Sequence, residues 1–209
     1  DSIMAFWNAP VEVPDHATRA CRAALKMRAA IDALNGSDVF GFSARGFEDP
    51  RVRIGVGINA GLACVGNMGS QRRFNYSAMG DVVNVAARIE SASKAFNADL
   101  LVSEDVAQRA KGIALLEAGE ILLKGKSRPT KIYAIAGDEV VAASPEFAEW
   151  KRQHGALLAA IKAGHVQDAD AALARCRELA GDDMRDFYRH FAEQAATLES
   201  ASAGKLVHR

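Results

Sequence analysis

The first part of the chain alternates between short apolar runs and longer amphipathic ones. Residues 2–10, SIMAFWNAP, are aromatic and apolar and end in an Asn-Ala-Pro break, which is typical of a buried strand followed by a loop. From Asp15 onward, apolar residues recur every three or four positions until Asn35-Gly36 ends the run. This spacing predicts a helix with Asp15 as its N-cap.

Residues 51–70, RVRIGVGINAGLACVGNMGS, carry apolar side chains at alternate positions. The alternation predicts two strands joined near Asn59-Ala60-Gly61, and it places Cys64 in the core. A Gly-Asp pair then precedes the helix-like run DVVNVAARIES, in which Asp81 is well placed to act as the cap. Two strands and a second helix are therefore expected here.

The run at 98–105, ADLLVSED, predicts a strand followed by a short helix that Ser103 caps. The run at 114–137 predicts a pair of strands around a polar turn at 124–130. Strands that alternate with helices and end in a hairpin indicate an α/β or α+β domain with one sheet covered by helices.

The pattern changes after Asp138, where the sequence becomes alanine-rich, charged and helical. Ser144-Pro145 is a typical helix start, and glycines separate three predicted helices near 145–163, 166–180 and 183–199. We therefore divide the chain into a domain at 1–137 and a helical tail at 138–209. The tail resembles one tetratricopeptide helix pair, but a small helical appendage on the domain explains the pattern equally well.

Composition and charge exclude several classes of protein. The 26 basic and 26 acidic residues cancel, and 49 % of the residues are apolar, as in soluble globular proteins. The chain lacks the long basic block that a nucleic-acid partner would require. Its three cysteines form no CxxC pair, and no apolar run approaches the roughly 20 residues that span a bilayer. We expect a cytoplasmic domain without a membrane segment in this chain, although a parent protein could be anchored upstream.

Two polar residues interrupt the second predicted helix. Asn84 and Arg88 lie four positions apart, so they project from one helical face, while Val85 and Ile89 point away from it. Taken alone, such a pair is usually the solvated face of an amphipathic helix. The pair would also aim an amide and a guanidinium at one point in space.

The strings DSIMAFWNAP, IGVGINAG, VGNMGS, YSAMGDVVNVAARIES and LKGKSRPTKIYAI occur in the order and spacing typical of one family. Over residues 1–137 the chain resembles the class III nucleotidyl cyclase catalytic domain of bacterial type. The resemblance implies an α+β fold with a ferredoxin-like βαββαβ core, partial here. It also implies a head-to-tail homodimer that holds a nucleoside triphosphate between its subunits. The reaction would yield a 3′,5′-cyclic monophosphate and pyrophosphate.

The resemblance assigns roles to four residues of this sequence. It implies that Asn84 orients the ribose, that Arg88 stabilises the transition state, and that Lys124 reaches the triphosphate, with Lys126 as the alternative lysine. It matches Asp1 to the second of two aspartates that bind two Mg²⁺ or Mn²⁺ ions per site. The first aspartate would lie upstream of Asp1, so we expect residues 1–209 alone to be inactive.

The same resemblance implies that Ser77 reads the purine, with Ala78 and Met79 forming part of the base pocket. A hydroxyl can donate or accept a hydrogen bond, so Ser77 suits adenine and is also compatible with guanine. ATP is the favoured substrate, which would make the protein an adenylate cyclase that produces cyclic AMP. The alternatives are a guanylate cyclase that uses GTP, and a cyclase-like module that binds nucleotides without catalysis.

Overall fold

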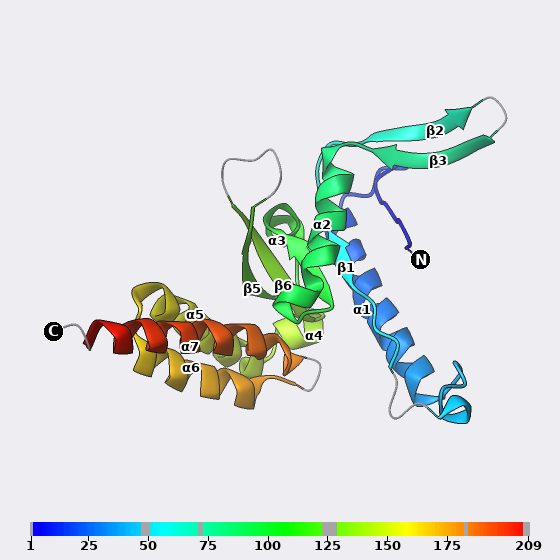
Figure 1. Cartoon of the computed structure of the whole chain (residues 1–209). Helices are drawn as coiled ribbons and strands as arrows, with labels where there is room; N and C mark the ends of the chain where they lie inside the picture. Colours follow the sequence, from blue (N-terminus) through cyan, green and yellow to red (C-terminus); the bar gives the residue numbers. More distant parts are fainter. Residues whose placement is uncertain (1, 47–50, 71–72, 123–128, 182–183, 207–209) are drawn as a thin grey trace.

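A four-stranded sheet forms the centre of the molecule, in a computed structural model that describes residues 2–46, 51–70, 73–122, 129–181 and 184–206 (Figure 1). The strand order is β1-β4-β6-β5. The strands are β1 (Val56–Ile58), β4 (Leu100–Ser103), β5 (Ala114–Ile121) and β6 (Thr130–Gly137). Strand β1 pairs in parallel with β4, and the other neighbours are antiparallel.

Apolar layers cover both faces of this sheet because side chains alternate along each strand. Helices α1 (His16–Gly36) and α3 (Glu104–Arg109) pack on one face, where Cys21 and Val106 share a buried cluster with Val102 of β4. Helix α2 (Asp81–Phe96) packs on the other face, where Ile89 shares a second cluster with Leu101. The sheet therefore lies between two helical layers.

Strands β2 (Cys64–Ser70) and β3 (Arg73–Met79) form a separate antiparallel hairpin that projects from the body of the molecule (Figure 1). Phe74, Tyr76 and Met79 are exposed on it. Cys64 is exposed as well, so its predicted place in the core is wrong. A two-stranded ribbon without a covering layer offers no core for that side chain to enter.

The described part of the tail forms four helices, α4 (Glu139–Ala142), α5 (Pro145–Ala163), α6 (Val166–Leu179) and α7 (Phe187–Leu206). The Ser144 hydroxyl accepts a hydrogen bond from the Phe147 amide at 3.1 Å, which caps α5 as predicted, and Gly164 ends that helix in the left-handed conformation. Phe147 and Phe191 lie in the same buried cluster as Ile89 of α2. The tail thus shares a core with the sheet.

The structure confirms a helix between Asp15 and Gly36, a helix over the run at 81–91, the Ser103 cap and the hairpin of β5 and β6. The predicted strand at 2–10 is wrong, because none of these residues is in a strand. None of the described strands pairs with this segment, although the ring of Phe6 lies 5.9 Å from that of Tyr76 on β3. Two elements that the sequence did not predict are β3 and α4, along with the 3₁₀ turn Ser43–Arg45.

Both aspartates that were expected to cap helices have other roles. Asp15 occupies the N-cap position of α1, but its carboxylate accepts a hydrogen bond from Arg19 at 2.8 Å instead of capping a backbone amide. The N-cap of α2 is Gly80, so Asp81 is the first residue of the helix. There its negative charge complements the positive end of the helix dipole. No described helix is long and apolar enough to span a membrane.

Candidate functional site

The candidate site begins on helix α2, which presents Asn84 and Arg88 one turn apart. The apolar side of this helix is anchored, because Val85 is 4 % exposed and Ile89 is fully buried. Asn84 is exposed and Arg88 is half-buried on the other side. Neither side chain has a hydrogen bond or an ion pair with another described residue. The amide and the guanidinium are thus available to a ligand.

Strand β1 fixes the position of α2 through a very close approach of the two backbones. A Cβ atom at Gly57 would lie 2.9 Å from Glu90 Cα and closer still to the carbonyl oxygen of Ala86. Only glycine leaves room for this approach. The Asn59 side chain makes a second contact with α2, since its amide donates a hydrogen bond to the carbonyl oxygen of Val82 at 3.0 Å.

Gly57 and Asn59 therefore position the helix that carries Asn84 and Arg88. The alternating apolar pattern of this stretch predicted only a strand and its connection, so the positioning roles of both residues were missed. The available signal was the glycine inside an alternating apolar run, because such a residue often marks a close backbone approach. Nothing in the local pattern identified Val82 as the partner of Asn59.

The three residues matched to the base pocket lie at the end of strand β3. Ser77 is half-buried and pairs across the hairpin with Gly66, while Ala78 is buried. Met79 is 59 % exposed. Gly80 alone separates this strand from α2, and its φ of 139° suits glycine. Base-pocket and helix candidates therefore belong to one continuous strand–helix unit.

Two of the predicted site residues, Asp1 and Lys124, lie outside the described residues, as does Lys126. The structure therefore does not place the metal-binding and triphosphate-binding candidates relative to α2. Among the residues that it does describe, no group of three or more His, Cys, Asp or Glu side chains could hold a metal ion. The metal prediction rests on Asp1 and on the family pattern.

Comparisons with known proteins identify this domain. Residues 1–137 match the model of the adenylate and guanylate cyclase catalytic domain. Adenylate cyclase 1 of Rhizobium meliloti (strain 1021) is 38 % identical over 138 residues, covering 66 % of this chain and 20 % of that protein. An adenylate cyclase of Anabaena cylindrica is 30 % identical, covering 56 % of this chain and 24 % of that protein. The chain thus spans about a fifth to a quarter of these relatives.

Solved structures of the same family share the fold. The adenylyl cyclase CyaB from P. aeruginosa matches with a TM-score of 0.51 and 30 % identity, covering 61 % of this chain and 63 % of that one. The guanylyl cyclase Cya2 matches with a TM-score of 0.52 and 30 % identity, covering 64 % of each chain. The α+β class with a helical C-terminal part is confirmed. The chain belongs to the adenylate and guanylate cyclase catalytic-domain family.

Proposed function

We propose that the complete protein is an adenylate cyclase that converts ATP to 3′,5′-cyclic AMP and pyrophosphate. The observation that carries the proposal is the pair Asn84 and Arg88, which lie on one face of α2 without a polar partner among the described residues. A purely regulatory domain would have no chemical need for both side chains. Their placement next to the β3 residues proposed for the base supports a single nucleotide site.

In the proposed reaction the ribose 3′ oxygen forms a bond to the α-phosphorus and loses its proton to solvent. The bond from that phosphorus to the oxygen of the leaving pyrophosphate breaks. Asn84 orients the ribose for this in-line attack, and Arg88 stabilises the negative charge that shifts onto the phosphoryl oxygens. A guanidinium suits this role because its donors are fixed in a planar fork.

The remaining proposed ligands complete the site around the triphosphate. Lys124 would neutralise the phosphate chain, and Asp1 would hold one of two Mg²⁺ or Mn²⁺ ions together with an aspartate that the family places upstream. When bound, such ions activate the attacking oxygen and neutralise the triphosphate. Ser77 would read the base, with Ala78 and Met79 against the purine ring.

We further propose that the site forms between two copies of the chain, with Asp1 of one subunit facing Asn84 and Arg88 of the other. The exposed apolar residues of the β2–β3 hairpin support this proposal, since Phe74 is 61 % exposed and Tyr76 is 49 % exposed. Exposed apolar surface of this kind favours a protein partner. The cyclase domain at 1–137 would form this dimer, and the tail at 138–209 would remain attached to it.

The test measures cyclic nucleotide formation by the complete protein with ATP or GTP and with Mg²⁺ or Mn²⁺. Arg88→Ala should lower kcat by about 10²- to 10³-fold and leave KM nearly unchanged, because the lost interaction forms mainly in the transition state. The kcat of Arg88→Lys should lie between those of the wild type and Arg88→Ala, because lysine keeps the charge but lacks the planar fork of donors. Lys94→Ala, which removes an exposed cation from the same helix, is the matched control.

Wild-type turnover by the Arg88→Ala variant would contradict the role of Arg88. Cyclic GMP as the main product would make the protein a guanylate cyclase, an outcome that Ser77 permits and that the likeness to Cya2 favours. Nucleotide binding without any cyclic product would instead support the non-catalytic module.

A further inference from the structure

An irregular point of strand β5 is one of the places where the helical tail meets the part of the molecule that carries the candidate site. The pairing of β5 with β6 shifts register between Glu117 and Gly119, which marks a β-bulge. Gly119 has a φ of 145°, and a Cβ atom there would lie 2.9 Å from the ring of Phe96. The bulge therefore lets the last residue of α2 pack closely against the strand.

A buried chain of hydrogen bonds joins the tail to the same bulge. His154 of α5 is 3 % exposed, and its Nε2 lies 2.8 Å from the carbonyl oxygen of Glu117. A carbonyl only accepts, so Nε2 must carry the proton and Nδ1 of the neutral ring must accept. The Tyr188 hydroxyl, 3.1 Å from Nδ1, donates the hydrogen bond that Nδ1 accepts. It accepts in turn from Nε1 of Trp150 at 2.7 Å.

Helix α7 contacts the same end of α2 directly. The ring of His190 packs edge-on against Phe96 with 5.1 Å between the ring centres. Phe96 is 6 % exposed, so it lies between the strand and the tail as part of the shared core. Burial lowers the pKa of both histidines below the ordinary value, which keeps the His154 ring neutral and its bonding pattern fixed at neutral pH.

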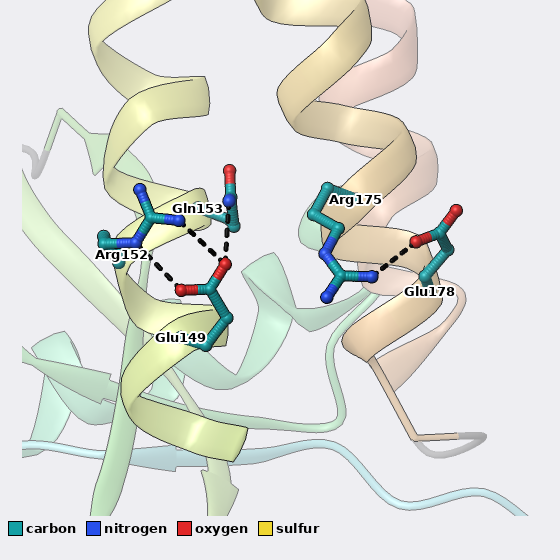
Figure 2. Close-up of polar contacts among 5 residues, drawn as sticks. All are labelled: Glu149, Arg152, Gln153, Arg175 and Glu178. Atoms are coloured by element: carbon teal, nitrogen blue, oxygen red, sulfur yellow. Dashed lines mark hydrogen bonds and ion pairs between the residues drawn. The ribbon is translucent and has the colours of Figure 1, made fainter. Parts of the chain in front are cut away.

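The outer surface of the tail is built differently. Figure 2 shows that Glu149 contacts Arg152 and Gln153 within α5, and that Arg175 contacts Glu178 within α6. Each of these contacts stays inside one helix and lies on the exposed side. Arg152 and Gln153 lower the pKa of Glu149 to about 2, but such exposed pairs do not attach the tail to the sheet. The buried hydrogen bonds from Trp150 through Tyr188 and His154 make that attachment.

We propose that tail helices α5 and α7 clamp helix α2 through the β5 bulge, and that His154 is a positioning residue for Asn84 and Arg88. The inference rests on the proposed function, because its catalytic consequence needs a working cyclase site. The residues on α2 that anchor the helix, Val85 and Ile89, lie in the same cluster as the tail aromatics. Loosening the clamp therefore shifts the helix that carries the reacting side chains.

The test compares three variants of the complete protein by cyclase kinetics and by amide hydrogen exchange. His154→Leu removes both ring nitrogens and should lower kcat by roughly ten- to a hundredfold, with KM nearly unchanged, because it disturbs alignment and not ground-state binding. Exchange of the α2 amides should rise more than exchange of the α1 amides. His154→Gln, whose amide can donate to the Glu117 carbonyl, should recover much of the lost kcat.

His165→Leu is the matched control, since His165 lies at the start of α6 with a side chain that is 67 % exposed. It should change neither kcat nor exchange. Unchanged kcat and unchanged α2 exchange in a folded His154→Leu protein would overturn the clamp. So would an equal rise of exchange in α1 and α2, which would indicate ordinary loss of stability.

If His154→Leu does not fold, Tyr188→Phe provides the second test, because it keeps the buried ring and removes only the hydroxyl that orients His154. Like His154→Leu, it should lower kcat and raise the exchange of the α2 amides, each by a smaller factor. No change in either quantity would overturn the clamp. Absence of cyclase activity in the unaltered protein would refute the proposed function alone. The exchange comparison would still decide whether the tail holds α2.

Discussion

Replacing Gly57 by alanine tests whether strand β1 fixes the helix that carries the candidate site. The added Cβ atom would lie 2.9 Å from Glu90 Cα, and closer still to the Glu90 amide nitrogen and the Ala86 carbonyl oxygen. All three atoms belong to the α2 backbone, so no side-chain rotation can relieve the clash. The obstructed turn, from 86 to 90, contains Arg88.

The size of the effect follows from this geometry. Non-bonded heavy atoms ordinarily lie about 3.5–4.0 Å apart, so α2 must move away from β1 by on the order of 1 Å. Overpacking of this kind costs about 1–3 kcal/mol of unfolding free energy. A displacement of about 1 Å at a catalytic side chain lowers turnover by roughly a hundredfold. Gly57→Ala should therefore lower kcat more than its modest loss of stability would suggest.

The assay combines urea unfolding with cyclase kinetics of the complete protein. Gly55→Ala is the matched control, because its Cβ would meet the Ser93 Oγ at 2.7 Å and the Glu90 carboxylate at 2.9 Å. Both are ends of flexible side chains that can rotate away, so this variant should remain near wild type. Equal kcat values for Gly57→Ala and Gly55→Ala would refute the claim that β1 positions Arg88.

Two further outcomes are expected. Mixing Asp1→Asn with Arg88→Ala, each of which should have little activity alone, should restore about a quarter of the wild-type activity. Half of randomly paired dimers are mixed, and each mixed dimer has one intact site of two. No recovery on subunit exchange would refute the shared site. The pKa of His154 is lowered by burial from its ordinary value of 6.5, so the unfolded chain binds a proton that the folded protein does not. Unfolding free energy should therefore fall as pH drops below about 6.5, and His154→Gln should lessen the slope by at most about 1.4 kcal/mol per pH unit in urea titrations.

Local periodicity was sufficient to predict helix α2 and its polar pair. The alternation of Val85 and Ile89 with Asn84 and Arg88 depends only on the geometry of the helix itself, and the structure buries the first two as expected. The same holds for helix α5, whose start at Ser144-Pro145 is encoded by residues adjacent in sequence. Elements defined by near neighbours were therefore predictable.

Features that depend on distant partners were not predictable in this way. The run at 2–10 has the composition of a strand, yet a strand forms only where another strand lies beside it. Conversely, β3 includes exposed Phe74 and Tyr76 and forms because β2 pairs with it, not because one of its faces is buried. The exposure of Cys64 has the same origin. An apolar pattern alone cannot distinguish a covered strand from a projecting hairpin.

Composition gave little information on how the tail packs against the domain. The shift to alanine-rich helix after Asp138 marks a change in local structure, and the family match ends at residue 137. The buried cluster nevertheless continues across that point, since Trp150 and Phe191 of the tail share it with Ile89 of α2. A boundary in composition is therefore not a boundary in packing. Because packing sets the position of α2, the tail belongs to the physical environment of Asn84 and Arg88 even though none of the family's motifs lies in it.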